Sequence, residues 1–365
     1  MTDPATTTRT TRRLRVVFLP HWHDNPYQHL LADGLGRLGA DVTHVERRLW
    51  FLPALWRDGR PDVVHLHAPD HFVVYERSGV RAALALGVLM FQLAALRALG
   101  IRVAWTAHDL TNHERRFQTL DRWCRRATAR LAHVVIVHCV EARRLVASAL
   151  GLDEARLVVV PHGSYIGCYP EFMDGRDAAR QALRLPADPL VVLFLGNLRR
   201  HKGVDALLDV FDRIERPGVR LVIAGQPFDE GIAAELSARA AGRVSVDYRP
   251  GVVPDAELGT YFAAADLVAC PFASSLTSGS LALALSFGKP IVAPRLGCAV
   301  EMATEAAGFL YDAGAPDGLL SALRTAIDSA QVLPAIGVAN RERMRQLDWT
   351  ALAARTVEAY GVSNG

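Results

Sequence analysis

The stretch LVVLFLGNLRRHKGVDALLDVF (residues 190–211) carries the clearest structural pattern in this chain. It begins with six apolar residues typical of a buried strand, continues into the loop GNLRRHKG (196–203) and ends in a helical pattern. A glycine-bearing loop between a strand and a helix places backbone N–H groups and cations where phosphate groups are commonly held. The stretch therefore predicts one β–α unit of an α/β domain that binds a phosphorylated ligand.

The same alternation continues on both sides of this stretch. Apolar or β-branched runs occupy 14–20, 41–45, 62–67, 102–107, 133–138 and 156–161 before it, and 220–224, 244–248, 267–270 and 290–293 after it. Helix-like segments separate these runs, which is the pattern of βαβ units in buried parallel sheets. We therefore predict an α/β protein with two Rossmann-like, doubly wound domains.

A polar stretch at 169–189 interrupts the alternation, so we place the linker between the two domains near 170–188. The expected parts are a disordered leader (1–13), an N-terminal domain (14–172), a C-terminal domain that binds the phosphorylated ligand (186–345) and a terminal helical segment (346–365).

Size and composition exclude several classes of protein. The 365 residues are 50% hydrophobic and 22% charged, which suits packed cores and excludes a disordered or fibrous chain. The formal net charge of +3 is too small to indicate nucleic-acid binding. Five cysteines without a CxxC pair predict a reduced, intracellular protein, and no signal peptide is expected. The apolar run 82–99 contains Gln92 and Arg97, which favours a buried or membrane-grazing helix.

Several motifs argue against common ligand sites. GLGRLG (34–39) matches the dinucleotide fingerprint, but it ends a helix and precedes a strand, the reverse of the required order. The sequence contains no GxxxxGK[ST] and no DxD, which excludes a P-loop NTPase and disfavours a metal-bridged sugar-nucleotide site. The pairs His21/His23 and His65/His67 have the spacing that points two side chains to one side of a strand. No third ligand is in register, so we expect histidines that line a cleft and no metal site.

Glycines, hydroxyls and cations gather in the loops that follow the predicted strands, where open parallel sheets bind their ligands. Lysine usage marks one of these loops, because the chain has only two lysines, Lys202 and Lys289, beside 39 arginines. A lysine in a glycine-adjacent loop of such a chain indicates a need for a compact ammonium, whereas Lys289 in GKP suits a turn. LTSGSL (276–281) offers hydroxyls and N–H groups at a helix N-terminus, which suits phosphate oxygens or plain N-capping.

Together these segments resemble the glycosyltransferases of the GT-B fold. The resemblance runs along nearly the whole chain and rests on the order and spacing of VVVPHG (158–163), FLGNLRRHKGVDALLDVF (194–211), LVIAGQ (221–226), YFAAADLVACPF (261–272), SGSLALALSFGKPIVAP (278–294) and GCAVEM (297–302). It implies two Rossmann-like domains that face a cleft, with the C-terminal helix crossing back onto the first domain.

The resemblance also implies that the second domain binds a nucleotide-diphosphate sugar, with no metal ion and no other cofactor. Arg199 and Lys202 would neutralise the diphosphate leaving group, while the base and ribose would lie against 225–227 and 249–253. The donor-binding residues expected on this basis are Asn197, Arg199, Lys202, Gly225, Val252, Thr277, Ser278, Gly279, Ser280 and Glu301.

The chain departs from the large retaining family of this layout. That family has two glutamates ahead of the GKP-like turn, and Ser275 and Leu283 stand at those positions here. Asn197 stands where that family has an arginine, with Arg199 as the substitute. NPYQ (25–28), TAHDLTNHE (106–114) and PHGSYIGCYP (161–170) make the chain more similar to bacterial exopolysaccharide β-mannosyltransferases that use GDP-mannose.

The function implied is a metal-independent transfer of a hexose, mannose from GDP-mannose, to a saccharide or lipid-linked saccharide in polysaccharide biosynthesis. Three alternatives stay open. The chain could be a UDP-sugar-dependent transferase for glucose or glucuronate with the same fold, a nucleotide-sugar epimerase that needs no acceptor, or a nucleotide-sugar-binding protein without catalysis.

An inverting transfer needs a general base for the acceptor hydroxyl. The catalytic candidates at first-domain strand ends are His108, Glu114 and Asp24, and the acceptor-binding candidates are His23, Asn25, His113 and His162. His108 alternatively only shapes the cleft, and Glu114 alternatively caps a helix or pairs with a neighbouring arginine.

Basic residues recur in ERRFQTLDRWCRRATAR (114–130), with Phe117 and Trp123 among them. This pattern is typical of a solvated helix face or of a surface that attracts anionic lipid headgroups or a lipid-diphosphate acceptor. We expect a cytoplasmic protein, and the alternative is a peripheral protein on the inner face of the cell membrane. No nucleic-acid recognition motif accompanies the charge.

Overall fold

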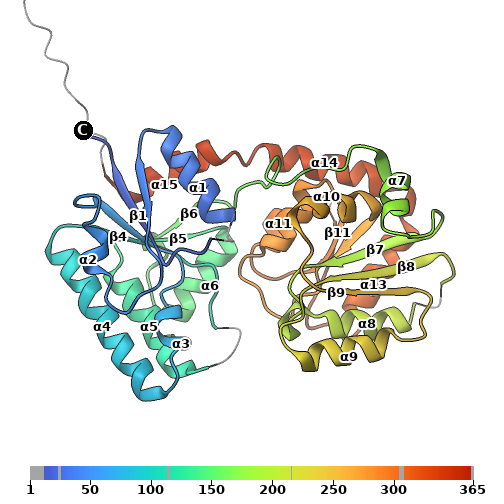
Figure 1. The fold of residues 1–365 in the computed structure, drawn as a ribbon, viewed down its shortest axis with the longest axis horizontal. Helices are drawn as coiled ribbons and strands as arrows, with labels where there is room; N and C mark the ends of the chain where they lie inside the picture. Colours follow the sequence, from blue (N-terminus) through green and yellow to red (C-terminus); the bar gives the residue numbers. More distant parts are fainter. Residues whose placement is uncertain (1–11, 24–25, 113–115, 215, 304–307, 363–365) are drawn as a thin grey trace, which may run out of the picture. The chain divides into compact units, whose positions relative to one another are not determined.

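The chain folds into two compact units in the computed structural model (Figure 1). The first unit comprises the chain up to Val137, Arg143–Val160 and the segment from Trp349 onward, and the second comprises His138–Ala142 and Pro161–Asp348. The residues that the structure describes are 12–23, 26–112, 116–214, 216–303 and 308–362. Most of the predicted leader, residues 1–11, lies outside them.

The first unit is built on an all-parallel sheet with the strand order β2-β1-β3-β4-β5-β6. Its strands are β1 (Arg15–Leu19), β2 (Asp41–His44), β3 (Val63–Leu66), β4 (Arg102–Thr106), β5 (Val134–Val137) and β6 (Leu157–Val159). Its helices are α1 (Pro26–Arg37), α2 (Leu52–Leu55), α3 (His71–Val74), α4 (Gly79–Ala98), α5 (Gln118–Leu131), α6 (Val140–Leu150), whose first residues belong to the second unit, and α15 (Trp349–Tyr360). Each run predicted for this half forms a strand, because central parallel strands are buried on both faces.

The second unit repeats this architecture with the order β12-β11-β10-β7-β8-β9. Its strands are β7 (Leu190–Leu195), β8 (Val219–Gly225), β9 (Val246–Pro250), β10 (Leu267–Ala269), β11 (Ile291–Pro294) and β12 (Gly308–Tyr311). Its helices are α7 (Gly175–Ala182), α8 (Val204–Asp212), α9 (Glu230–Ala240), α10 (Asp255–Ala264), α11 (Gly279–Ser286), α12 (Ala299–Met302), α13 (Gly318–Asp328) and α14 (Leu333–Arg345). The two sheets confirm the predicted fold class, although β12 and α14 were not predicted.

Helix α8 lies in the stretch 190–211, and the spacing of its apolar residues explains why it forms. Val204, Leu207, Leu208 and Phe211 recur at helical spacing, and all four side chains are buried in the core of the second unit. The helix begins directly after Gly203, so the core contacts of α8 hold the preceding loop at the carboxyl end of β7.

The terminal helix α15 belongs to the first unit and packs against α1 (Figure 1). The approach is close at Gly34, where a Cβ atom would lie 2.6 Å from the carbonyl oxygen of Trp349. The ring of Trp349 also meets Tyr27 edge-on, with 5.3 Å between the ring centroids. The glycines of GLGRLG therefore serve helix packing and helix termination, in agreement with the position of this motif in the sequence.

The stretch expected to be a linker is an ordered part of the second unit. It contains α7, whose buried Arg180 donates hydrogen bonds to the carboxylate of Asp266 at 2.6 Å and to the carbonyl oxygens of Ala264 and Pro189. Residues 161–172, which the sequence analysis placed in the N-terminal domain, also belong to the second unit. The polar composition of this segment did not indicate a helix in the second unit, because the hydrogen bonds of one buried arginine hold it there.

Candidate active site

Glycines bring the carboxyl ends of β7 and β8 together in the second unit. Gly196 and Gly225 have φ angles of 141° and 147°, and a Cβ on Gly225 would lie 1.8 Å from the carbonyl oxygen of Gly196. A Cβ on Gly196 would lie 3.4 Å from Oγ of Ser280, in the first turn of α11. Two strand ends and a helix N-terminus therefore converge where this class of sheet binds its ligands.

The N-terminus of α11 carries the predicted hydroxyl cluster. Ser278 caps the helix, its Oγ accepting a hydrogen bond from the backbone N–H of Leu281 at 3.3 Å, so the N-capping alternative holds for this residue. The Oγ1 of Thr277 lies 3.4 Å from Sγ of Cys298. Gly279 is exposed and Ser280 is half-buried, so the first turn of the helix is accessible to a ligand.

Three cations follow β7, and the structure separates their roles. Arg199 places its Cζ atom 4.3 Å from the ring centroid of Phe228, and Lys202 places Nζ 4.9 Å from the ring centroid of Phe272. Arg200 instead forms an ion pair with Glu235 of α9, with 3.1 Å between nitrogen and oxygen. Arg199 and Lys202 therefore form cation–π contacts near the carboxyl ends of the strands, whereas Arg200 pairs with a carboxylate.

Gly203 fixes the end of this loop. Its φ is 75°, and a Cβ there would lie 1.9 Å from the carbonyl oxygen of Pro271, the residue after Cys270 at the exit of β10. The backbone of His201 accepts a hydrogen bond from Ala273 N–H at 2.9 Å. Together these contacts hold Lys202 against the segment that leads to α11.

The remaining predicted donor residues occupy different environments. Asn197 is exposed beside Gly196, and Val252, beyond β9, is 76% exposed. The carboxylate of Glu301 accepts hydrogen bonds from the N–H groups of Val140 and Glu141 at 3.1 and 2.9 Å, so it occupies the N-terminus of α6. Lys289 donates to the carbonyl oxygen of Ala265 at 2.9 Å, and burial lowers its pKa to about 8.

His162 lies in the second unit, although it was predicted as an acceptor-binding residue of the first domain. Its ring is 5% exposed, its Nε2 lies 3.5 Å from Oη of Tyr165, and burial lowers its pKa to about 4. Tyr165 in turn approaches α11, since a Cβ on Gly279 would lie 3.5 Å from its hydroxyl. His162 therefore supports the loop beside α11.

In the first unit, His108 follows β4 and is half-buried. Its Nε2 lies 3.5 Å from Nδ1 of His67, which follows β3, and the two rings are nearly parallel with centroids 5.8 Å apart. Tyr27 of α1 meets the His108 ring edge-on at 4.9 Å between centroids. The structure thus brings His108 into a group of aromatic side chains at the carboxyl end of the first sheet.

A buried network beneath His108 was not predicted. His65 is fully buried, and its Nδ1 and Nε2 lie 2.8 Å from the hydroxyl of Tyr360 and 2.7 Å from that of Thr106. Burial lowers the pKa of His65 to about 3. The HxH spacing was the one sequence signal for this network, and the rings of His65 and His67 do share one side, stacked at 4.4 Å between centroids.

A buried charge cluster holds the loop that carries His108. The guanidinium of Arg125 pairs with Asp70 at 2.9 Å and with Asp121 at 2.8 Å, and it donates to the carbonyl oxygen of Asp109 at 2.7 Å. Asp121 also accepts from the backbone N–H of Asn112. Part of the basic helix predicted as a solvated face is therefore internal, while Trp123 on the same helix is 57% exposed.

Four predicted residues, Asp24, Asn25, His113 and Glu114, lie outside the described residues. His23 is exposed and its Nε2 lies 3.2 Å from a carboxylate oxygen of Glu46. Across the ranges that the structure describes, no three His, Cys, Asp or Glu side chains are grouped to hold a metal ion.

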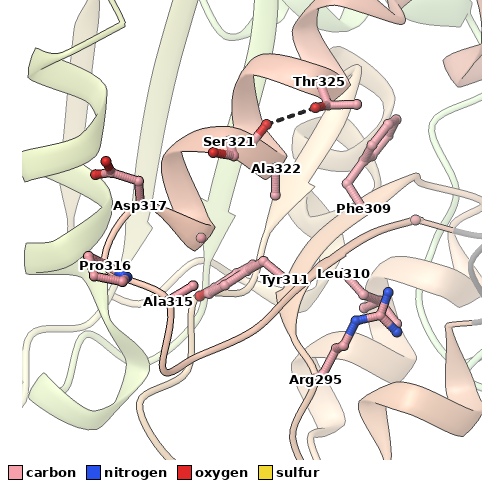
Figure 2. Close-up of a pocket in the computed structure, with 12 residues that line it drawn as sticks. Arg295, Phe309, Leu310, Tyr311, Ala315, Pro316, Asp317, Ser321, Ala322 and Thr325 are labelled. Carbon is pink, nitrogen blue, oxygen red and sulfur yellow. Dashed lines mark hydrogen bonds between the residues drawn. The ribbon is translucent and has the colours of Figure 1, made fainter.

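A separate hollow of about 750 Å³ lies beside β12 and α13 of the second unit (Figure 2). Arg295, Tyr311 and Asp317 contribute to its lining, and none of the predicted donor-binding residues does. Because it borders the edge strand and not the convergence of strand ends, it lies away from the candidate site.

The comparisons with known proteins cover both units. The family described as Glycosyltransferase Family 4 matches residues 12–164, and the family described as Glycosyl transferases group 1 matches residues 189–329. The chain is 26% identical over 358 residues to the GDP-mannose:glycolipid 4-beta-D-mannosyltransferase of Xanthomonas campestris pv. campestris, covering 95% of this chain and 94% of that protein. It is 31% identical over 215 residues to the D-inositol 3-phosphate glycosyltransferase of Segniliparus rotundus, but covers only 57% of this chain and 47% of that protein.

Solved structures agree on the fold. Sucrose-phosphate synthase from Thermosynechococcus elongatus matches with a TM-score of 0.74 at 18% identity, covering 96% of this chain and 98% of that one. Anabaena Alr3699/HepE in complex with UDP and glucose matches with a TM-score of 0.73 at 18% identity, covering 96% of this chain and all of that one. The chain is therefore a glycosyltransferase of the GT-B fold, with a Family 4 domain followed by a group 1 domain.

Proposed function

We propose that this enzyme transfers mannose from GDP-mannose to a lipid-linked saccharide, without a metal ion and with inversion at the anomeric carbon. The observation that carries the proposal is the match to a GDP-mannose:glycolipid mannosyltransferase over 95% of this chain, which includes both units. That relative is named for a β product, and GDP-mannose is an α-linked donor, so the proposed transfer inverts the configuration.

The second unit would bind the donor diphosphate. Negative charge grows on the diphosphate as its bond to the sugar breaks, and cations fixed beforehand stabilise that charge most effectively. Arg199 and Lys202 are held over aromatic rings, and the accessible first turn of α11 adds N–H groups on the same side of the sheet. These features support binding of the diphosphate by side chains and a helix N-terminus in place of a divalent metal.

The first unit would bind the acceptor and supply the base. The acceptor hydroxyl must lose its proton as its oxygen attacks the sugar, and an imidazole has the pKa range that suits this role near neutral pH. His108 stands at the carboxyl end of β4, where this type of sheet places functional side chains.

Transfer itself tests this proposal. The wild-type enzyme in EDTA should release GDP from GDP-mannose in the presence of a panel of octyl glycosides, and NMR of the product should show a β-mannoside. Release of nucleotide from UDP-glucose alone would move the donor to the UDP class, which the UDP complexes of Alr3699/HepE favour as the second candidate. An α-linked product would contradict inversion.

We further propose that helix α4 seats the enzyme on an anionic membrane surface. The stripe formed by Val80, Leu84, Gly87, Phe91, Ala94 and Ala98 recurs every three or four residues and is exposed along the whole helix. Val80, Leu84 and Phe91 are 73%, 65% and 60% exposed, and Trp50 stacks on Phe91 with 6.0 Å between centroids.

Both composition and charge favour a lipid surface for this stripe. Among the helices that the structure describes, α4 alone is long and apolar enough to cross a membrane, yet its other face is buried in the first unit. Arg48 is exposed in the segment that leads to Trp50, while its neighbour Arg47 pairs with Glu76 at 3.7 Å. An arginine beside exposed aromatic residues suits anionic headgroups.

Vesicle sedimentation tests this attachment. The enzyme should sediment with phosphatidylglycerol vesicles and less with phosphatidylcholine vesicles, and Phe91→Asp should abolish sedimentation. Val244→Asp in the second unit is the matched control, because Val244 is 85% exposed and lies outside the stripe. Equal sedimentation of the two variants would contradict the assignment of this surface.

A further inference from the structure

Three imidazoles form a column at the carboxyl end of the first sheet. His65 and His67 stack at 4.4 Å between centroids with 27° between their planes, and His67 and His108 stack at 5.8 Å with 23°. The first two rings are buried, and the third is half-buried. The column therefore runs from the interior of the first unit toward the side chain proposed as the base.

The inner end of the column is rigid. Both ring nitrogens of His65 have hydroxyl partners, on Tyr360 of α15 and on Thr106 of β4. Phe18 meets the rings of His65 and His67 edge-on at 5.3 and 4.8 Å between centroids. The ring of His67 packs against His65, which is held by two hydrogen bonds, and against the ring of Phe18. These contacts fix the orientation in which His67 contacts His108.

The outer contact joins two specific nitrogens, Nδ1 of His67 and Nε2 of His108, at 3.5 Å. This distance is long for a hydrogen bond, and hydrogen bonds of catalytic groups commonly shorten when the ligand binds. A neutral imidazole carries its one proton on either ring nitrogen, and a hydrogen bond here requires one of the two facing nitrogens to donate and the other to accept. The direction of this contact determines which nitrogen of His108 can take a proton.

We propose that His67 is a positioning residue that accepts the Nε2–H of His108 and so leaves the basic lone pair of His108 on Nδ1. The inference rests on the proposed role of His108 as the general base. In the transfer step, the O–H bond of the acceptor breaks and its proton moves to Nδ1 of His108. The acceptor oxygen forms the new glycosidic bond as the bond from the anomeric carbon to the diphosphate breaks, and that electron pair leaves on GDP.

The opposite direction would not support this chemistry. If Nδ1–H of His67 donated to Nε2 of His108, the proton of His108 would sit on Nδ1. That nitrogen could then only donate a hydrogen bond to the hydroxyl of the sugar acceptor and could not take its proton. A partner that selects one tautomer is the device by which other functional imidazoles are oriented. Tyr27 contributes packing to this arrangement, since it meets the ring of His108 by its edge.

Two substitutions of His67 separate positioning from structure. In His67→Leu the acceptor of the contact is lost, whereas in His67→Asn the amide oxygen stands near the former Nδ1 and can accept the same hydrogen bond. The control is His133→Asn, because His133 directly precedes β5 of the first unit and accepts from the backbone N–H of Val103, outside the column.

The readouts are GDP release from GDP-mannose with octyl glycosides and the ring ¹⁵N spectrum of His108, assigned with His108→Gln. We expect His67→Leu to lower kcat about 10- to 100-fold, by analogy with the loss found when the outer hydrogen-bond partner of a metal-bound histidine is removed. His67→Asn should recover most of that loss, and His133→Asn should match the wild type. The wild-type spectrum should show the Nε2–H tautomer of His108. The spectrum of His67→Leu should show a mixture of the Nε2–H and Nδ1–H tautomers.

The outcomes distinguish this inference from the proposed function. If His108→Gln abolishes transfer while His67→Leu keeps both the wild-type kcat and the wild-type tautomer, the role of His67 is wrong and the proposed base stands. If His108→Gln keeps full kcat, the proposed base and this inference both fail. If no donor is turned over, the proposed function fails, and a wild-type spectrum with the proton on Nδ1 of His108 would still overturn the inference independently.

Discussion

The candidate functional residues of each unit are positioned by different means. In the second unit, backbone geometry places the site: Gly196, Gly203 and Gly225 allow approaches that a Cβ would block, and a helix begins beside them. In the first unit, buried side chains place the site: the His65 network and the Arg125 charge cluster lie under the loop that carries His108. A site positioned by backbone geometry can be recognised from local sequence motifs. A site positioned by buried side chains depends on residues that are distant in sequence and come together only in the folded sheet.

The largest effect should come from breaking the charge cluster of the first unit. Arg125→Met would leave two buried carboxylates without their cation, and burial already raises the pKa of Asp70. We expect a loss of about 3–5 kcal/mol in the free energy of unfolding, measured by urea denaturation. Arg345→Met is the control, because its partner Glu342 and Arg345 itself are exposed. Equal losses in the two variants would show that the cluster does not hold the first unit.

In the second unit, removing one cation should impair turnover and spare the fold. Lys202→Ala should lower kcat about 10²- to 10³-fold, the effect of losing one preorganised charge-stabilising group, with an unchanged melting temperature. Arg200→Ala on the same loop should stay within about twofold, since Arg200 pairs with Glu235. Rates of GDP release measure kcat for both variants. A larger loss of kcat in Arg200→Ala than in Lys202→Ala would show that Arg200, and not Lys202, stabilises the diphosphate.

A smaller effect should follow from adding one methyl group to the site positioned by backbone geometry. Gly225→Ala adds a Cβ against the carbonyl oxygen of Gly196 at a φ of 147°, and should cost about 1–3 kcal/mol of stability. Gly242→Ala also has a positive φ, but no atom lies within 4 Å of its added Cβ. Thermal unfolding should therefore separate the two, and identical melting temperatures would contradict the close approach of β7 and β8.

The smallest expected effect is on the pH dependence of stability. Burial lowers the pKa of His65 to about 3, while an unfolded histidine titrates near 6.5, so the unfolded state binds more protons below that pH. The stability contributed by neutral His65 is fully present above pH 6.5 and is lost as the pH falls, by about 1.4 kcal/mol at pH 5.5. His65→Gln should flatten this slope in urea denaturation between pH 7.5 and 5.5. An unchanged slope would show that His65 does not titrate as its burial requires.

Much of the fold could be predicted because its signals are local. Apolar runs such as 190–195 and 133–138 form central parallel strands with both faces buried, and the helix after 196–203 follows from its 3.6-residue periodicity. Strand β12 was missed although its sequence GFLY is apolar, because an isolated run of four residues is too short for its periodicity to indicate a strand. The linker prediction failed because α7 depends on buried Arg180 and not on an apolar run.

The candidate site could be predicted only in part. The cations, glycines and hydroxyls of the second unit stand in two short motifs, and the structure gathers both at one end of the sheet. The partners of His65 come from residues 106 and 360, and no spacing rule relates those positions. His162 was assigned to the wrong unit because the chain leaves the first sheet just before it, at Val160.

Calorimetric titration of GDP-mannose in EDTA measures whether the second unit binds the donor diphosphate without a metal ion. Metal-independent binding by Arg199 and Lys202 predicts a measurable affinity for the wild type and at least a tenfold weaker affinity in Lys202→Ala and in Arg199→Ala, with wild-type affinity in Arg200→Ala. Binding that appears only after Mg²⁺ is added, or an affinity that Lys202→Ala leaves unchanged, would contradict it.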